Sequence, residues 1–238
     1  MNPERYQKRM TFAKEGRLKF IGHLDLLRIF QRAMNRCGID LVYSQGYNPH
    51  PQMSFAQPLS LGMTGKREYM ELQLASEWED DLLIRTLNQE LPEGLHMLEC
   101  ADMPPGTKSA MALVTHAQYE IVLPRDEEYP YERWLKDFMN LPEITILRLA
   151  KYHGRKQEIA VNIRPLIESL ELAGPYTLKL WCVCSNVQNV KPDRMMQAFW
   201  EWTGHPQRAG EEEICRIDLF RQEGERRLNL MELLHCEK

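Results

Sequence analysis

The chain has 238 residues, with 30 Lys and Arg against 34 Asp and Glu. It contains no apolar run approaching the roughly 20 residues that a membrane-spanning helix needs, and its polar start is unlike a signal peptide. Its cysteines are scattered, which fits reduced thiols better than a disulfide framework. We therefore expect a cytoplasmic protein with no membrane partner.

Elements of the first half alternate between strands and a helix. The predicted order is a strand over 5–13, a turn at 14–16, a short strand over 18–21, a helix over 24–37, extended segments over 53–61 and 68–74, a helix from 76 to 90, and a strand over 95–101. Gly38 favours a left-handed end to the first helix, and Ser76 with Glu79 fits a capping box. This β-α-β-β-α-β order predicts an α+β ferredoxin-like sandwich.

The second half predicts a similar series. The predicted elements are a strand over 118–123, a helix starting at Pro130, a hairpin of 144–152 and 158–163 around Gly154, a strand over 176–184, a last helix from Pro192 to Gly204, and a strand over 214–220. A turn-rich break lies at 103–107. We therefore predict two ferredoxin-like domains in tandem, with antiparallel sheets and helices on one face, over 1–106 and 107–227. A tail over 228–238 is expected to be poorly ordered or to dock.

Positive charge gathers near the start of the chain. Residues 1–67 hold 11 basic and 4 acidic residues, whereas residues 68–238 hold 19 basic and 30 acidic ones. Such asymmetry favours a polyanion-binding surface on the first segment. The alternative is that folding mixes these charges in space, in which case no basic patch forms.

The predicted helix over 24–37 has two contrasting sides. Its apolar side consists of Leu26, Leu27, Ile29, Phe30, Ala33, Met34 and Cys37. Arg28, Arg32 and Arg36 follow one another by single turns on the opposite side, with no glutamate at i+4. The row favours anion binding over a merely solvated face that is paired through Asp25.

A loop after this helix carries an unusual set of side chains. Two prolines flank His50 and restrict the directions in which its imidazole can point. Aromatic rings beside cationic side chains are typical of single-stranded RNA sites. The candidate RNA- or ligand-binding residues are Arg17, Lys19, His23, Arg28, Arg32, Arg36, Tyr43, Ser44, Gln45, Tyr47, Asn48, His50 and Phe55. His23 and His50 are either proton-transfer groups or structural hydrogen-bonding residues.

Searches for other chemistry are negative. The chain has no phosphate-binding loop, no dinucleotide fingerprint, no nucleophile elbow and no cysteine triplet for an iron–sulfur cluster. Cys182 and Cys184 lie two apart on a predicted strand, and no second pair stands at metal-ligand spacing. We expect buried structural thiols there, with no metal and no cofactor.

The first half resembles the radical-SAM-linked protein family, a domain found fused to radical S-adenosylmethionine proteins or as their separate companion. The matching segments are Gly16-Arg17-Leu18-Lys19-Phe20, His23-Leu24-Asp25, Arg28, Arg32, Tyr43-Ser44, Gly46-Tyr47-Asn48-Pro49-His50-Pro51, Ser54-Phe55-Ala56, Pro58-Leu59, Gly62 and Glu68-Tyr69. Tyr47 stands where the family has phenylalanine. The resemblance covers about residues 5–105 and implies a radical S-adenosylmethionine protein as partner. More distantly, the expected topology is similar to that of double ferredoxin-like ribonucleases that process CRISPR repeat RNA.

Three functions follow as hypotheses. The first is a non-catalytic accessory protein that binds tRNA or ribosomal RNA and presents it to a radical S-adenosylmethionine partner. The second is a metal-independent endoribonuclease that uses His23 or His50 as acid or base. The third is a companion subunit that binds protein alone. RNA cleavage distinguishes the second hypothesis from the first, and salt-dependent RNA binding distinguishes the first from the third.

Overall fold

The structure, a computed structural model, describes residues 6–152 and 155–236. The chain is a mixed α/β protein, and the described strand pairings are antiparallel. It divides into two compact units. Unit 1 takes the chain up to residue 116 and again from residue 216, and unit 2 takes residues 117–215.

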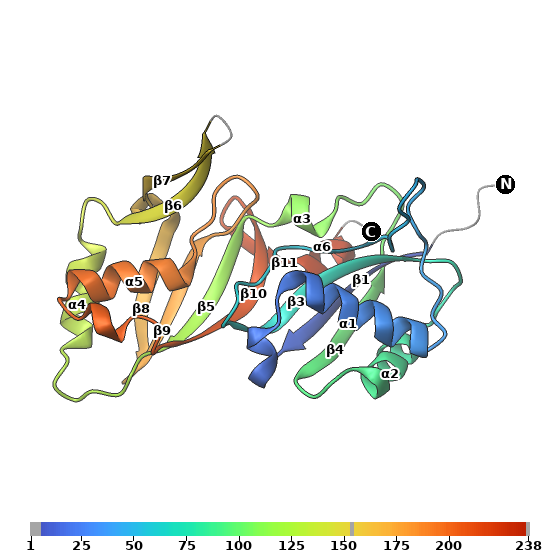
Figure 1. Ribbon diagram of the computed structural model, residues 1–238, viewed down its shortest axis with the longest axis horizontal. Helices are drawn as coiled ribbons and strands as arrows, with labels where there is room; N and C mark the ends of the chain where they lie inside the picture. The colour runs from blue at the N-terminus through green and yellow to red at the C-terminus, as the bar shows by residue number, and fades with distance from the viewer. Residues whose placement is uncertain (1–5, 153–154, 237–238) are drawn as a thin grey trace. The chain divides into compact units, whose positions relative to one another are not determined.

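Unit 1 contains segments from both ends of the chain (Figure 1). Its elements are β1 (Tyr6–Lys14), the 3-10 turn η1 (Gly16–Phe20), α1 (His23–Arg36), β2 (Met53–Phe55), β3 (Thr64–Leu74), α2 (Asp80–Glu90), β4 (Leu95–Asp102), α3 (Ala110–Leu113), β10 (Glu213–Glu223), β11 (Arg226–Asn229) and α6 (Leu230–Cys236). β10 begins in unit 2 and continues into unit 1. The strands lie in the order β4-β1-β3-β10, with β2 also on β3 and β11 on β10.

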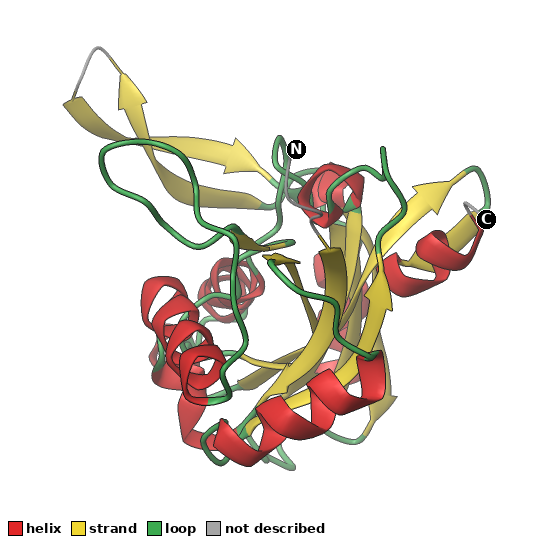
Figure 2. Cartoon of the chain, turned by 90° about the vertical axis from the view of Figure 1, so that its right-hand side faces the viewer, coloured by secondary structure: helices red, strands yellow, loops and turns green. Residues whose placement is uncertain are grey.

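Alternation along β1 and β3 separates two faces of this sheet. Met10 lies opposite Met70, and both side chains point into the apolar core. The intervening residues Arg9 and Glu71, also opposite each other, point to the other face. Figure 2 shows the strands as a twisted layer with helices packed along it.

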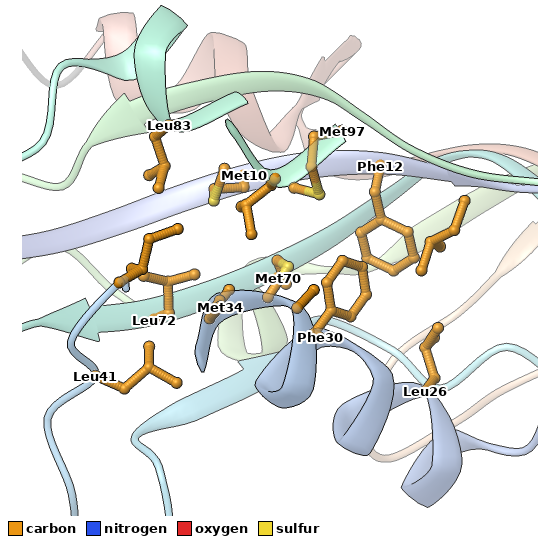
Figure 3. Packing of buried hydrophobic residues seen from close by; sticks show 14 of the residues in the cluster. Met10, Phe12, Leu26, Phe30, Met34, Leu41, Met70, Leu72, Leu83 and Met97 are labelled. Carbon is orange, nitrogen blue, oxygen red and sulfur yellow. The ribbon is translucent and has the colours of Figure 1, made fainter. Parts of the chain in front are cut away.

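The apolar core of unit 1 lies between this sheet and the helices α1 and α2 (Figure 3). The apolar side of α1 is buried as predicted, through Leu26, Phe30 and Met34 among others. The Phe30 ring meets the Phe12 ring edge-on, with centroids 5.0 Å apart. α1 ends at Cys37, and Gly38 adopts a positive φ of 68°, the left-handed stop that the sequence predicts.

Three local predictions in unit 1 are wrong. The segment expected as a strand over 18–21 belongs to η1, because Gly16 has a φ of 56° and turns the chain there. The expected strand over 53–61 is only the three residues of β2. The start of α2 is capped by Glu79, whose carboxylate accepts from the backbone N–H groups of Asp81 and Leu82, instead of by a box opened at Ser76.

The C-terminal segment is part of unit 1. It forms β11 and α6, and the Leu230, Leu233 and Leu234 side chains of α6 are buried. The fully buried Arg9 guanidinium donates to the Leu230 carbonyl at 2.7 Å and to the Lys108 carbonyl at 2.9 Å. A buried cation from the first strand therefore stabilises the position of the last helix.

Unit 2 has its own strands and helices. Its elements are β5 (His116–Val122), α4 (Tyr131–Met139), β6 (Thr145–Tyr152), β7 (Arg155–Asn162), the 3-10 turn η2 (Arg164–Leu166), β8 (Ile167–Gly174), β9 (Thr177–Val183), α5 (Pro192–Trp202) and η3 (Pro206–Arg208). The strands lie in the order β5-β9-β8, and β6 and β7 pair only with each other. The predicted hairpin is thus present, while Gly154 lies outside the described residues. Strand β8 was not predicted, because its Glu168, Ser169 and Glu171 resemble a loop composition.

Aromatic side chains on α4 and α5 fill much of the interior of unit 2. The rings of Phe138 and Phe199 meet at 89° with centroids 5.3 Å apart, and Phe199 also meets Trp200 at 5.3 Å. Phe199 and Trp200 are fully buried. Such edge-to-face contacts add to the stabilisation that burial of apolar surface provides.

Two ferredoxin-like sandwiches in tandem are not confirmed. The predicted division at 106/107 differs from the compact units, because β10, β11 and α6 return to unit 1. Unit 2 pairs three strands in its main sheet and keeps a separate hairpin. The coarser prediction of an α/β protein with antiparallel strands and several helices is confirmed.

Candidate functional site

The loop between α1 and β2 folds back on itself in unit 1. Tyr43 forms an isolated antiparallel bridge with Pro51, and the Ser44 N–H donates to the His50 carbonyl at 2.9 Å. The loop then joins the sheet, because the Gln73 N–H donates to the Gln52 carbonyl at 3.0 Å. The strand β3 therefore positions a loop that contains several of the predicted site residues.

His50 is held by the side chain of Ser44. The His50 backbone N–H donates to Ser44 Oγ at 3.1 Å, and Ser44 Oγ lies 2.9 Å from His50 Nδ1. Because the hydroxyl oxygen already accepts from the backbone, its proton is well placed to donate to Nδ1. This arrangement favours the neutral tautomer with the proton on Nε2, which leaves an N–H donor at the far edge of the ring.

Behind this loop lies a polar hollow of about 350 Å³. Its polar lining residues are Gln7, Ser44, His50, Gln52, Glu71 and Gln73. Gln73 Oε1 is buried and has no hydrogen-bond partner among the described residues. A buried acceptor without a partner is costly, so this group is a ready partner for a hydrogen-bond donor on a ligand.

Sequence reasoning found the loop and missed the other wall of the hollow. Gln7, Glu71 and Gln73 lie on β1 and β3, where alternation places them on the face opposite Met10 and Met70. Their strand positions predicted a polar face, but their proximity to His50 depends on the pairing of β1, β3 and the loop. The available signal was this alternation, combined with the register of the two strands.

The tip of the loop extends into solvent. Tyr47 is fully exposed, and Gln45 and Asn48 beside it are also exposed. An aromatic ring without packing partners contributes no burial to the fold. Tyr47 is therefore available for stacking, whereas Tyr43 at the base of the loop is 39% exposed.

Phe55 and His23 lie elsewhere in unit 1. Phe55 is 5% exposed and packs on Phe12, Phe30 and His23, so it belongs to the core and cannot stack on an RNA base. The His23 ring borders a second, very small hollow of about 10 Å³ that shares no lining residue with the hollow beside His50. The prediction that Phe55 is a base-binding ring is therefore wrong.

Lys14 lies beside His23 in this small hollow. It is buried, and its Nζ donates to the Ile21 carbonyl at 2.9 Å. Burial lowers the pKa of Lys14, an effect that the nearby Glu68 carboxylate opposes. His23 does not cap α1, whose N-cap is Gly22 and has no side-chain cap bond.

The arginine row on α1 is partly neutralised. Arg28 pairs with Asp25 at 2.9 Å, and Arg36 pairs with Glu90 of α2 at 2.6 Å. The expectation of a row without acidic partners is therefore wrong, because α2 brings Glu90 next to Arg36. Arg32 is exposed between them.

Arg17 and Lys19 lie on η1, next to exposed apolar side chains. Phe20, Leu24 and Leu61 are each about two-thirds exposed, at 64%, 66% and 64%. The Gly62 N–H donates to the Lys19 carbonyl at 2.8 Å, which brings the segment around Leu61 next to η1. The sequence search did not single out this apolar group.

The charge imbalance along the chain does not become an imbalance between units. Unit 1 holds 18 basic and 19 acidic residues, because residues 68–116 and 216–238 add acidic side chains to the basic first segment. Any cationic surface on unit 1 is therefore local, as at Arg28 and Arg32.

Searches for a metal site and a membrane span gave no candidate. Within 6–152 and 155–236, no group of three His, Cys, Asp or Glu side chains is arranged to hold a metal ion. Cys182 and Cys184 are buried free thiols. No helix in the described part of the chain combines the length and the apolar character needed to cross a membrane.

Comparisons with known proteins give one informative match. The model of the family described as "Uncharacterized protein conserved in bacteria (DUF2344)" matches residues 7–192. The comparison with curated proteins found no match. A crystal structure of an unknown protein from Galdieria sulphuraria is 11% identical and covers 92% of this chain and 100% of that chain, but its TM-score of 0.27 carries no argument. None of these findings names a radical S-adenosylmethionine protein.

Proposed function

We propose that this chain, which belongs to the DUF2344 family of bacterial proteins, is a non-catalytic accessory protein that binds single-stranded RNA through the loop 43–51 and the hollow behind it. The observation that carries the proposal is the juxtaposition of an exposed stacking ring, Tyr47, with a polar hollow that His50 borders. RNA sites commonly pair a stacking platform with hydrogen-bonding groups that recognise base edges.

The hollow supplies both kinds of hydrogen-bonding group. Glutamine amides from Gln7, Gln52 and Gln73 offer donors and acceptors, and the Nε2 edge of His50 offers a further donor. A volume of about 350 Å³ falls in the range of small-ligand sites, roughly 300–1,000 Å³. An unstacked base inserted here would supply a donor for the Oε1 atom of Gln73.

Arg32 on α1 is the most available phosphate contact. It is exposed, whereas its neighbours Arg28 and Arg36 already pair with carboxylates. Exposed ion pairs contribute little, so phosphate can displace Asp25 from Arg28 at small cost. Arg36, which also donates to the Glu90 carbonyl at 2.7 Å, is more firmly engaged.

The partner in this proposal is a radical S-adenosylmethionine protein, to which the chain presents tRNA or ribosomal RNA in the cytoplasm. The ground for this partner class is the resemblance of residues 16–69 described above. The exposed group of Phe20, Leu24 and Leu61 supports a protein contact on unit 1, because apolar side chains exposed together favour interaction surfaces.

The test measures the binding of short single-stranded RNA to the full chain by fluorescence anisotropy. Tyr47→Ala and His50→Ala should each weaken binding by about 1–3 kcal/mol, because each removes a contact to a base. Arg32→Gln should reduce the slope of log affinity against log salt by about one. Arg85→Gln on α2, also exposed, is the matched control and should change neither quantity. Unchanged affinity in the folded Tyr47 and His50 variants would exclude the loop as the RNA site.

The same samples test the alternative of a metal-independent endoribonuclease. Wild-type protein should leave labelled RNA intact in the presence of EDTA. Cleavage that is lost in His50→Ala or His23→Ala, with binding retained, would establish catalysis instead. The two histidines border separate hollows, so each must be replaced singly.

A further inference from the structure

A second hollow, of about 400 Å³, lies within unit 2 at the start of α4. Three tyrosines border it, namely Tyr129, Tyr131 and Tyr176. The Tyr131 ring is nearly perpendicular to both others, at 86° to Tyr129 and 86° to Tyr176, with centroids 5.8 Å and 6.1 Å away. Rings set at right angles around one space form an aromatic cage.

The charges around this hollow are mainly negative. Asp126, Glu127 and Glu132 line it, against one lining cation, Arg133. Arg133 lies 3.6 Å from Asp137 on α4, so its charge is partly neutralised outside the hollow. Glu127 and Glu132 are exposed, and no ion pair is described for either. The hollow thus lacks a compensating cation.

The structure already contains a cation bound on the neighbouring tyrosine. The Arg208 guanidinium lies 5.4 Å from the centroid of the Tyr129 ring and pairs with Asp126 at 2.7 Å. This arrangement joins an aromatic ring and a carboxylate around one positive group. Tyr131 and Tyr176, with Glu127 and Glu132, repeat the same combination around the open space.

We propose that the hollow in unit 2 binds an organic ammonium group, with Tyr131 and Tyr176 against its methylene or methyl carbons and Glu127 and Glu132 near its charge. The quadrupole of the rings and the carboxylates both attract a cation and repel an anion. The Leu172 side chain completes an apolar wall that suits the carbons attached to the nitrogen. A metal ion would not use the rings, which have no ligand atoms besides the hydroxyls.

An ammonium group of this kind comes from a small polyamine or from a lysine side chain of another protein. The experiment is isothermal titration of the full chain at low salt with two probes, spermidine and a neutral-capped lysine peptide. At least one probe should bind with a dissociation constant below about 1 mM, and the tighter probe identifies the source. The acetylated form of that probe, which lacks the charge, should bind at least 10-fold more weakly.

Two variants connect the binding to this hollow. Glu127→Gln with Glu132→Gln removes the charges, and Tyr176→Leu keeps the apolar volume while removing the ring. Each should weaken the probe by about 10-fold, whereas Glu143→Gln, an exposed carboxylate of unit 2 away from the hollow, should not. Circular dichroism confirms that each variant is folded. No binding of either probe up to 10 mM, equal binding of the acetylated probe, or equal loss in Glu143→Gln would overturn the proposal. The assay contains no RNA, so its result is independent of the function proposed for unit 1.

Discussion

The two units stabilise their interiors by different means. Every buried charged side chain in the described ranges lies in unit 1, namely Lys8, Arg9, Lys14, Glu68, Arg216 and Asp218. The interior of unit 2 contains instead a network of aromatic contacts between α4, α5 and the residues next to them. Unit 1 therefore depends on specific partners for its charges, and unit 2 depends on shape and apolar area.

The central ion pair of unit 1 joins β3 to β10. The Arg216 guanidinium donates to both carboxylate oxygens of Glu68, and it also donates to the Gln57 carbonyl at 2.8 Å. Both side chains are almost completely buried. Such a pair often adds little net stability, but it strongly disfavours arrangements that separate its members. It thus acts mainly on which strands pair, whereas an aromatic core tolerates substitutions of similar volume.

The largest effect is expected from breaking that pair. Arg216→Met leaves the Glu68 carboxylate buried without its partner and should lower the free energy of unfolding by about 3–5 kcal/mol. Hydrogen exchange followed by mass spectrometry should show faster exchange in peptides of β1 and β3. The double variant with Glu68→Gln removes both charges and should be less destabilised than Arg216→Met. A loss below about 1 kcal/mol in the single variant would mean that water reaches Glu68.

An intermediate effect is expected from pH. Burial raises the pKa of Asp218 to about 6, against which its hydrogen bond from Tyr69 acts. The folded state therefore holds a proton that the unfolded state has lost between about pH 4 and pH 6, so this group makes stability fall as pH rises through that window. Above pH 6 the loss is complete, and it amounts to at most about 3 kcal/mol for a shift of about two pKa units.

Asp218→Asn removes this titration while keeping an acceptor for the Tyr69 hydroxyl, which lies 2.5 Å from Asp218 Oδ1. Relative to wild type, the variant should gain stability between pH 4 and pH 7, as measured by urea unfolding at several pH values. The difference between the two proteins matters, because other carboxylates titrate in both. Parallel pH profiles would show that Asp218 is solvated more than its burial implies.

The smallest effect is expected in unit 2. Phe199→Leu conserves most of the buried volume but loses ring contacts to Trp134, Phe138 and Trp200, so it should cost about 1–2 kcal/mol. Hydrogen exchange should quicken in peptides of α4 and α5. Phe20→Leu, at an exposed position, is the matched control and should cost less than about 0.5 kcal/mol. A cost for Phe199→Leu as large as that for Arg216→Met would contradict the contrast between the units.

Local patterns were sufficient for most helices and for the hairpin in unit 2. The apolar side of α1 and its stop at Gly38 follow from a period of 3.6 residues and from the freedom of glycine at positive φ. The same reasoning failed for η1 and for the start of α2, where neighbouring residues offered alternative turns and caps. It also missed α6, whose buried leucines were assigned to a tail.

For the candidate site, the sequence by itself determined the loop, its exposed Tyr47 and the restriction that two prolines place on His50. These properties depend on residues close together in the chain, so local chemistry defines them. Only the tertiary structure decided that Gln7 and Gln73 complete a hollow with His50, that Phe55 is buried, and that Glu90 neutralises Arg36. Each of these contacts joins residues far apart in the chain, and their proximity depends on strand register and helix packing, which no local pattern specifies.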